Sequence, residues 1–427
     1  MAGSACDTAV EVVNFGCRLN ALEGDGIARA AAGAGLSRAL VVNTCAVTGE
    51  AVRQARQAIR RARRDEPGRP IVVTGCAAQT EPATFGAMDE VDLVLGNVAK
   101  SDLATWQSVR AALDFGIAAD AKVRVQDMAA VREATPHLAD RFEGHTRAFV
   151  EVQNGCDHRC TFCIIPFARG PARSVPMGAV VQQVRRLVEA GHAEVVLTGV
   201  DLTAYGADLP GAPTLGRLVK AVLAAVPELK RLRLSSLDAV EADAALMHAL
   251  AEEERLMPHL HLSLQSGDDV ILKRMKRRHS RREALAFIAA LRRARPQVAL
   301  GADIIAGFPT ETEAQARATR DFVEESGLAF LHVFPYSPRQ GTAAARMPQL
   351  SGGTVSDRAA RLRETAAVLL RRHLSSEIGQ RRSVLVEAGG RGHTEHFTPV
   401  RIARPATRGS LADLRIAGHD GARLIAA

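Results

Sequence analysis

The chain has 427 residues, of which 47% are hydrophobic and 24% charged, an ordinary globular composition that is long enough for two or three domains. No uninterrupted apolar run approaches the ~20 residues of a membrane-spanning helix, and no basic segment followed by an apolar core opens the chain. We therefore expect a cytoplasmic protein without a membrane segment. The odd number of cysteines, seven, argues against a disulfide framework and favours metal-bound thiolates.

The formal net charge is +8, which suits a polyanionic partner such as RNA. An arginine-rich composition throughout the chain would produce the same excess, so the charge alone leaves both interpretations open. Only 4% of the residues are aromatic, so we do not expect an extended stacking platform for single-stranded nucleic acid.

Four short apolar runs alternate with helix-like segments over residues 8–115. Each run is rich in β-branched residues, as buried parallel strands are. The alternation predicts an open parallel α/β sheet as the N-terminal domain. The runs are at residues 10–16, 39–45, 70–76 and 91–97.

Three cysteines follow the first three of these runs: Cys17, Cys45 and Cys76. Because the carboxyl ends of parallel strands meet at one edge of a sheet, we expect these thiols to converge there. The alternative is three unrelated buried cysteines, which behave as small hydrophobes. We assign no role to Cys6, which lies in a polar N-terminal tail.

Two further segments in about the first third of the chain are rich in charged residues. Residues 53–64, RQARQAIRRARR, could meet RNA phosphates or form a solvated helix face. Residues 116–145 have mixed charge and little periodicity, and we interpret them as a linker between two domains.

Six further strand-like runs, again separated by helix-like segments, indicate a partial (β/α)6 barrel over residues 146–376. In barrels of this kind the active site lies at the carboxyl ends of the strands. The runs are at residues 148–153, 194–199, 231–236, 259–265, 298–307 and 329–334.

The loop after the first of these runs reads GCDHRCTFC and holds Cys156, Cys160 and Cys163 in a C-x3-C-x2-C spacing. Thiolates are soft ligands that suit zinc and iron–sulfur clusters. Three thiolates would leave one iron of a [4Fe–4S] cubane without a protein ligand. A zinc site normally has four protein ligands, and His158 could supply the fourth here. Both metal centres remain open on spacing alone.

This loop, with Phe162 as its aromatic residue, resembles the signature of radical S-adenosylmethionine (radical SAM) enzymes. The resemblance implies a [4Fe–4S] cluster whose open iron binds SAM, and an external electron donor that drives its cleavage to a 5′-deoxyadenosyl radical. Residues at the ends of the later runs match, in order, segments that line the cofactor site in that family. Any one of them could equally be a helix cap or turn former. The candidates are Gly199, Asp201, Ser235, Gln265 and Asp303.

The N-terminal motifs FGCRLN, VVNTCAVT and VVTGCAAQ resemble those of the methylthiotransferase family. The resemblance implies a second [4Fe–4S] cluster held by Cys17, Cys45 and Cys76, which carries the sulfur to be inserted and needs a sulfur donor. Residues 377–427 contain short runs that predict a small antiparallel β-barrel, similar to the RNA-binding TRAM domain of this family.

Within the family, GCRLN, NTCAVT and MKRRH resemble the MtaB-type branch. That branch acts on N6-threonylcarbamoyladenosine at position 37 of tRNA, 3′ of the anticodon, and places a methylthio group on C2 of the adenine. The alternatives are methylthiolation of a ribosomal protein side chain or of isopentenyladenosine in tRNA. A non-catalytic iron–sulfur protein that binds RNA is a further hypothesis. The basic run at residues 272–282 could contact the anticodon stem-loop or the cofactor, or be a solvated loop.

Overall fold

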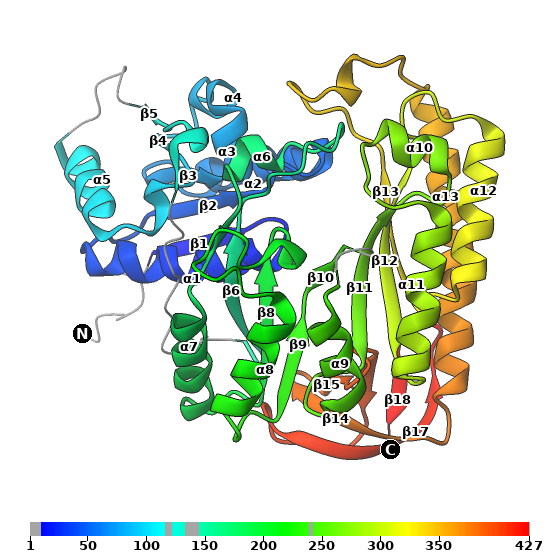
Figure 1. Cartoon of the computed structure of the whole chain (residues 1–427). Helices are drawn as coiled ribbons and strands as arrows, with labels where there is room; N and C mark the ends of the chain where they lie inside the picture. The colour runs from blue at the N-terminus through cyan, green and yellow to red at the C-terminus, as the bar shows by residue number, and fades with distance from the viewer. Residues whose placement is uncertain (1–9, 116–121, 133–144, 239–241, 427) are drawn as a thin grey trace.

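The computed structural model describes residues 10–115, 122–132, 145–238 and 242–426, so Cys6 lies outside the described residues. Figure 1 shows three units: an N-terminal α/β unit, a large central unit of curved sheet and helices, and a small C-terminal β unit beneath the central one. Within the described ranges no helix is both long and apolar enough to cross a membrane.

The N-terminal unit is an open five-stranded sheet in the order β1-β2-β3-β4-β5. Every neighbouring pair is parallel, and β2 and β3 are buried along their whole length. This confirms the predicted open parallel sheet. Its strands are β1 (Glu11–Asn14), β2 (Leu40–Thr44), β3 (Ile71–Gly75), β4 (Leu93–Leu95) and β5 (Val123–Arg124), and its longer helices are α1 (Arg18–Gly33), α2 (Gly49–Asp65) and α5 (Leu103–Phe115).

Strand β5 lies inside the segment that we interpreted as a linker. It pairs in parallel with β4 and completes the N-terminal sheet. The strand has two residues, Val123 and Arg124, which is too short for an alternating pattern to be recognised in a sequence. Part of the supposed linker is therefore an edge of the N-terminal sheet.

The central unit confirms the predicted partial barrel. Its strands form two four-stranded sheets, β7-β6-β8-β9 and β10-β11-β12-β13, and β9 of the first sheet contacts β11 of the second. Seven of the strands pair in parallel, namely the two-residue β10 (Ser236–Leu237) and six longer strands, one for each predicted run. The six are β6 (Ala148–Asn154), β8 (Glu194–Gly199), β9 (Arg231–Leu234), β11 (His259–Gln265), β12 (Ala299–Ala306) and β13 (Phe330–Pro335).

Helices cover the outside of these strands (Figure 1). The longest, α13, begins after the capping side chain of Ser351 and packs against β12 and β13. The helices are α7 (Met177–Glu189), α8 (Leu215–Ala225), α9 (Ala244–Glu252), α11 (Arg281–Ala294), α12 (Glu313–Ser326) and α13 (Gly352–Ser376), with the short strands β7 (Arg173–Ser174) and β10 (Ser236–Leu237) between them.

Helix α1 contributes to two hydrophobic cores. Leu19 and Leu22 are buried in the same cluster as Val150 of the barrel strand β6. Ile27 and Ala31, further along the helix, are buried in the core of the N-terminal unit. The amino end of α1 is thus part of the barrel interior, whereas its carboxyl end belongs to the first sheet.

The C-terminal unit is a closed five-stranded barrel, as predicted, although β16 and β18 pair in parallel rather than antiparallel. It covers the amino ends of the central strands, because the ring of Phe397 lies 5.1 Å from that of His259, the first residue of β11. Its strands are β14 (Arg381–Glu387), β15 (Arg391–Thr394), β16 (Pro399–Ile402), β17 (Leu411–His419) and β18 (Leu424–Ala426).

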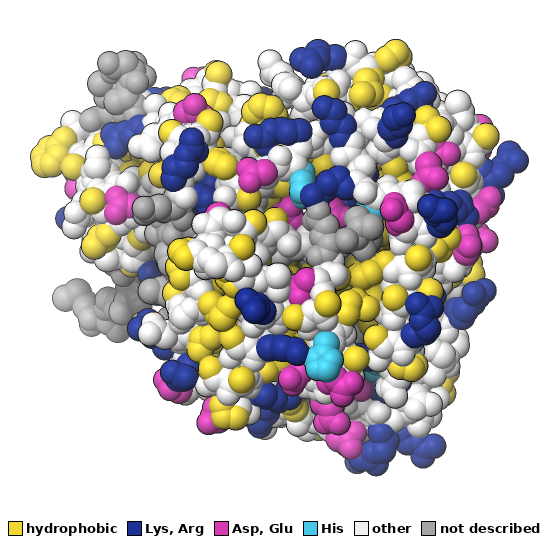
Figure 2. All heavy atoms as spheres, viewed as in Figure 1, with side chains coloured by type: hydrophobic (Ala, Val, Ile, Leu, Met, Phe, Trp, Pro, Cys, Tyr) yellow, Lys and Arg dark blue, Asp and Glu magenta, His cyan; other side chains and the backbone are white. Residues whose placement is uncertain are grey.

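Lysine and arginine side chains are spread over the face shown in Figure 2 and do not gather into one patch on it. Several arginines of α2 are engaged in ion pairs, including Arg63 with Asp92 at 2.6 Å and Arg53 with Glu50 at 2.6 Å. The positive charge of this helix is therefore partly neutralised within the protein.

Candidate functional site

Three of the cysteines at strand ends follow a glycine in the left-handed region of backbone space. The φ angles are +99° at Gly16, +96° at Gly75 and +73° at Gly155. A β-carbon at Gly75 would lie 2.4 Å from the backbone N and O of Thr44, and one at Gly155 would lie 1.9 Å from the carbonyl oxygen of Pro171. Glycine is required at these positions because both the φ angle and the available space exclude a side chain.

The loop with Cys156, Cys160 and Cys163 connects β6 to the short helix α6 (Ile165–Arg169). Backbone hydrogen bonds hold it in place: Cys156 N donates to Gly170 O at 3.1 Å, and Thr161 N donates to Met275 O at 3.0 Å. A loop tied at two points presents its side chains from a fixed backbone, which is what a preformed metal centre needs.

Phe162, the aromatic residue of the same loop, packs into an apolar cluster with Ile271, Met275 and Phe308. The ring therefore anchors the loop on the central unit. Its predicted contact with the cofactor remains a prediction.

The thiols of this loop are surrounded by groups that affect their charge. Burial raises the pKa of Cys156 to about 12, and the carboxylate of Asp201 adds to that effect. Burial likewise raises the pKa of Cys163 to about 12. The guanidinium of Arg277 donates to the sulfur of Cys160 at 3.8 Å. Such thiols stay protonated until a metal displaces the proton, so metal loading is coupled to proton release.

The spacing of the sulfur atoms distinguishes the two metal centres that the sequence left open. On a single tetrahedral zinc ion, Zn–S bonds of about 2.3 Å place the sulfurs about 3.8 Å apart. Among the described residues, which include all six cysteines at the strand ends, no three cysteine sulfurs lie within 4.8 Å of one another. A cubane attaches each thiolate to a different iron, so its thiolates lie further apart than those on one zinc ion.

His158 does not complete a zinc site with the three thiols. Its Nε2 lies 2.7 Å from a carboxylate oxygen of Asp201. The set that it joins within 4.8 Å contains Asp201 and only one cysteine, Cys156. The residues present therefore fit an open iron–sulfur cluster better than a zinc knuckle.

Four of the predicted cofactor residues, Gly199, Asp201, Ser235 and Gln265, lie at or just past the carboxyl ends of barrel strands, whereas Asp303 lies in the middle of β12. Asp201, after β8, accepts hydrogen bonds from His158 and from Thr203 at 2.8 Å. Burial raises the pKa of its carboxyl group, but these two hydrogen bonds outweigh burial and lower it below the usual value. Gly199 approaches β6 closely, since a β-carbon there would lie 2.9 Å from the carbonyl oxygen of Gln153.

Ser235 lies between β9 and β10 and is buried, yet its hydroxyl oxygen has no hydrogen-bond partner within the described part of the chain. An unsatisfied buried hydroxyl costs about 1–3 kcal/mol, so a ligand atom that pairs with it would be stabilised there. Gln265 ends β11 with φ at +68°, a strained value for a residue with a side chain. Both features fit a ligand-binding edge of the barrel.

Asp303, on β12, is already engaged by two histidines. Its carboxylate lies 2.7 Å from His261 Nε2 and 3.2 Å from His332 Nδ1. Burial opposes ionisation, but hydrogen bonds from both rings dominate and lower the pKa of Asp303 to about 2. A contact between Asp303 and a cofactor remains a prediction.

The other three cysteines come together at the carboxyl edge of the N-terminal sheet, as their positions after β1, β2 and β3 predict. Cys45 and Cys76 are buried, whereas Cys17 is exposed. Burial raises the pKa of Cys45 to about 12, and the charges of Cys76 and Cys17 add to that effect. The three thiols therefore lie within electrostatic reach of one another.

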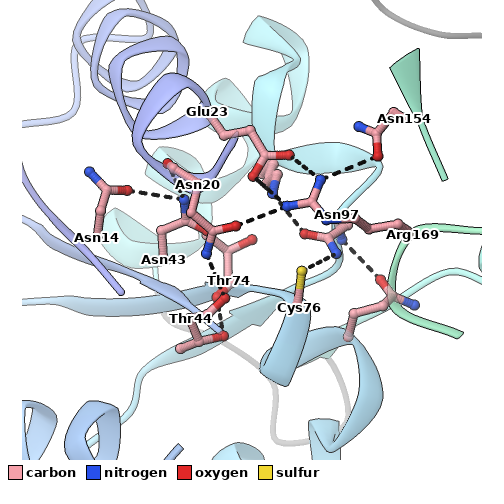
Figure 3. Close-up of polar contacts among 12 residues, drawn as sticks. Asn14, Asn20, Glu23, Asn43, Thr44, Thr74, Cys76, Asn97, Asn154 and Arg169 are labelled. Atoms are coloured by element: carbon pink, nitrogen blue, oxygen red, sulfur yellow. Dashed lines mark hydrogen bonds and ion pairs between the residues drawn. The ribbon is translucent and has the colours of Figure 1, made fainter. Parts of the chain in front are cut away.

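A buried polar network links this second cysteine group to the central unit (Figure 3). Glu23 of α1 pairs with Lys100 at 2.6 Å and with Arg169 of α6 at 2.8 Å. Asn97 donates to the sulfur of Cys76 at 3.8 Å and to the carbonyl oxygen of Ala168 at 2.7 Å. Sequence reasoning missed this network, because its members are far apart in the chain and share no local pattern.

The two cysteine groups face each other. The short helix α3 (Cys76–Thr80) packs against α6, and Ile164 and Ala168 lie in the same buried cluster as Cys76. The charge of Cys76 contributes to the raised pKa of Cys163. A cluster bound by Cys17, Cys45 and Cys76 would therefore lie next to one bound by Cys156, Cys160 and Cys163.

Charged side chains also lie inside the amino end of the barrel. Glu194 of β8 accepts from Arg233 at 2.9 Å and pairs with Arg147 at 3.1 Å. Burial opposes its ionisation, but these arginines lower the pKa of Glu194 to about 2. Burial, together with Arg233 and Arg147, lowers the pKa of Arg18 to about 10. The alternation RLRL at residues 231–234 is the signal that could have predicted arginines on the inner face.

Comparison with known proteins agrees with this architecture. The model of the radical SAM superfamily matches residues 150–323, and that of uncharacterized protein family UPF0004 matches residues 9–96. The radical SAM methyltransferase TsrM from Kitasatospora setae shares the fold, with a TM-score of 0.54 at 16% identity over 78% of each chain. The fold and the three-cysteine loop thus define a radical SAM protein, a class that uses SAM and a [4Fe–4S] cluster.

Relatives in sequence identify the family more closely. The chain is 48% identical to the threonylcarbamoyladenosine tRNA methylthiotransferase MtaB of Rickettsia prowazekii, over 96% of this chain and 94% of that protein. It is 37% identical to the protein of the same name from Bacillus subtilis, over 78% and 74% of the two chains. A tRNA-2-methylthio-N(6)-dimethylallyladenosine synthase from Anaplasma marginale is 35% identical over 92% and 89%. The chain belongs to the radical SAM methylthiotransferase family.

Proposed function

We propose that this protein is the enzyme that converts N6-threonylcarbamoyladenosine at position 37 of tRNA to its 2-methylthio derivative. The observation that carries the proposal is the pair of cysteine groups that face each other across α3 and α6. Four relatives named for this reaction match at 33–48% identity, whereas four named for dimethylallyladenosine match at 34–35%. The comparisons therefore favour threonylcarbamoyladenosine over isopentenyladenosine or a ribosomal protein as substrate.

Each cysteine group would hold one [4Fe–4S] cluster with one iron open to a ligand. Cys156, Cys160 and Cys163 would hold the cluster that binds SAM, with the unpaired hydroxyl of Ser235 and the amide of Gln265 at the edge of the cofactor site. The second cluster would be held by three ligands at the edge of the N-terminal sheet, which are Cys17, Cys45 and Cys76.

When bound, SAM and the two clusters supply a radical and a methylated sulfur. Radical chemistry is needed because the aromatic C2–H bond of adenine is inert to acids and bases. The protein brings the two sites together through the buried contacts between Glu23 and Arg169 and between Asn97 and Ala168. The reaction also needs an electron donor and a sulfur donor from outside the chain.

The tRNA would bind by its anticodon stem-loop, where position 37 is accessible because loop bases can be splayed out of the stack. We assign residues 8–115 together with strand β5 to the domain of the second cluster, the rest of 116–145 to the connection, 146–376 to the radical SAM domain and 377–427 to an RNA-binding barrel. The net charge of +8 supports a nucleic-acid substrate.

The test is the nucleoside content of tRNA from a strain that lacks this protein. Mass spectrometry should show N6-threonylcarbamoyladenosine in place of its 2-methylthio derivative, and expression of the protein should restore the derivative. Unchanged 2-methylthio-threonylcarbamoyladenosine in the deletion strain would overturn the proposal. Loss of the isopentenyladenosine derivative instead would identify the other tRNA substrate.

A further inference from the structure

One arginine in the barrel interior forms no direct ion pair or hydrogen bond with another residue in the described part of the chain. Arg18 is in the first turn of α1, directly after Cys17, and it is half-buried. Its guanidinium carbon lies 5.2 Å from the centre of the Phe397 ring, and the guanidinium carbons of Arg147 and Arg233 lie 4.9 and 4.8 Å from the same centre. Three cations therefore surround one aromatic ring.

Two of these arginines have anionic partners. Arg147 pairs with Glu194 at 3.1 Å and also with Glu387. Arg233 donates to Glu194 at 2.9 Å and to the carbonyl oxygen of Glu395 at 3.2 Å. Arg18 makes no hydrogen bond or ion pair to any residue in the described part of the chain. Its five N–H donors are therefore left to solvent or to a ligand.

The guanidinium of Arg18 lies beside two like charges, and the nearby carboxylate of Glu194 is already engaged by both of those arginines. A further anion would therefore be stabilised beside Arg18. Its planar fork matches a carboxylate at two points, and such charge-assisted bonds are strongest where water is partly excluded. Arg18 directly follows Cys17 in the chain, and its guanidinium lies within electrostatic reach of that cysteine, from whose group sulfur is transferred on the proposed function. An anion bound there would be part of the substrate or close to it.

The substrate of the proposed function carries such an anion. In N6-threonylcarbamoyladenosine the amine of threonine is bound in the carbamoyl group, so its carboxylate is free and negatively charged. Unmodified adenosine and isopentenyladenosine have no charge at this position. A site with an unpaired arginine therefore distinguishes the first nucleoside from the other two.

We propose that Arg18 binds the carboxylate of the threonylcarbamoyl group and so makes the enzyme specific for that nucleoside. This inference rests on the proposed function and adds to it the residue that recognises the N6 substituent. The ring of Phe397 holds the guanidinium from the C-terminal barrel, so the recognition site is shared by the first and last domains of the chain.

The test is the binding of three anticodon stem-loop RNAs to the reconstituted full-length protein, measured by fluorescence anisotropy. The RNAs carry at position 37 threonylcarbamoyladenosine, its carboxamide analogue (threoninamide in place of threonine), or adenosine. The wild-type protein should bind the acid roughly 10- to 100-fold more tightly than the amide, as expected for a charged hydrogen-bonded pair. Arg18→Gln should bind both RNAs equally and bind the adenosine RNA as the wild type does.

Two further variants control for charge and for folding. Arg29→Gln removes an exposed arginine of the same helix and should keep the wild-type preference for the acid. Arg18→Lys keeps the charge without the planar fork and should keep part of the preference. Thermal unfolding of Arg18→Gln should occur close to the wild-type temperature, since only the contact with the Phe397 ring is lost and no ion pair is broken.

Three outcomes would overturn the assignment. The wild-type protein could bind the acid and the amide equally, or Arg18→Gln could keep the preference for the acid. Arg18→Gln could also bind all three RNAs more weakly by the same factor, which would place Arg18 on the RNA backbone. Product analysis separates this inference from the proposed function. If the wild type forms no 2-methylthio product from the acid-bearing RNA, the proposed function fails. If it forms product while Arg18→Gln keeps the preference, only the role of Arg18 fails.

Discussion

Glu23 of α1 and Arg169 of α6 form a two-point ion pair across the boundary between the N-terminal and central units, with N–O distances of 2.8 and 3.1 Å. Both side chains are almost completely buried, and Lys100 approaches the same carboxylate to 2.6 Å. The pair fixes the helix that carries Cys17 against the helix that follows Cys163. One carboxylate thus aligns the two cysteine groups.

Replacing Glu23 by Gln should destabilise the protein strongly. Arg169 and Lys100 would remain buried as unpaired cations, and breaking a buried pair in this way costs about 3–5 kcal/mol. The free energy of unfolding of the apoprotein in urea measures the change. Glu50→Gln is the control, because it removes one partner of an exposed pair and should have little effect. Equal effects of the two substitutions would show that the buried pair is not what holds the units together.

Two cysteine variants test the assignment of two clusters. The reconstituted wild-type protein should hold about eight irons, because each cubane contains four. Cys17→Ala should retain about four irons and still cleave SAM to 5′-deoxyadenosine under anaerobic reduction. Cys156→Ala should also retain about four irons but lose SAM cleavage. An unchanged iron content in Cys17→Ala would contradict the second cluster, and absence of 5′-deoxyadenosine from the wild type would indicate a non-catalytic protein.

Gly75→Ala should lower both stability and iron content. The new β-carbon would be 2.4 Å from the backbone of Thr44, and φ is +96°. Strain and overpacking together cost about 2–5 kcal/mol. Gly191→Ala is a matched control, since φ is +94° there and nothing lies within 4 Å of the β-carbon. Thermal melting and iron analysis should show a large effect at Gly75 and only a strain effect of about 1–2 kcal/mol at Gly191.

Asp303→Asn should change how stability depends on pH. The pKa of Asp303 is lowered to about 2 from an ordinary value of 3.8, so its carboxylate stabilises the fold above about pH 4 and loses that effect as the pH falls towards 2. The shift corresponds to about 2 kcal/mol at most. Urea unfolding of the apoprotein should show the variant less stable at pH 6, with the difference shrinking by pH 3.

Asp321→Asn, an exposed position on α12, provides the comparison for this experiment. Its difference from the wild type should be small throughout the same pH range, because an exposed side chain without a buried partner contributes little to stability. If the difference in unfolding free energy between Asp303→Asn and the wild type is the same at pH 6 and pH 3, the two histidines do not act through the charge of the carboxylate.

The sequence predicted the parts of this protein that depend on local pattern. Each predicted strand run contains a strand, and the cysteines lie at strand ends because apolar runs followed by Gly-Cys or Thr-Cys mark where a buried strand stops. Strand β5 was missed because two residues form no pattern. The residues of the candidate cofactor site could also be predicted from the sequence, since residues at successive strand ends of a barrel meet at one edge.

Contacts between distant segments could not be predicted. Arg169 follows Glu23 by 146 residues, and only the docking of the N-terminal unit against the central unit brings them together. Arg18 was part of a recognised motif, but nothing in the sequence shows that it lies against Phe397 of the last domain. Hydrogen-bond partners of this kind depend on how the units dock, which periodicity does not describe.

The shared position of α1 affects how this protein can be divided or recombined. The two family models match residues 9–96 and 150–323 as if they were independent modules, yet Leu19 and Leu22 complete the hydrophobic interior of the second module. An exchange of N-terminal segments between relatives would therefore transplant part of the barrel core together with Arg18. The residue that we propose sets substrate preference and the residues that pack into the barrel lie on the same helix. A chimaera designed to change substrate preference must therefore also repack the barrel core.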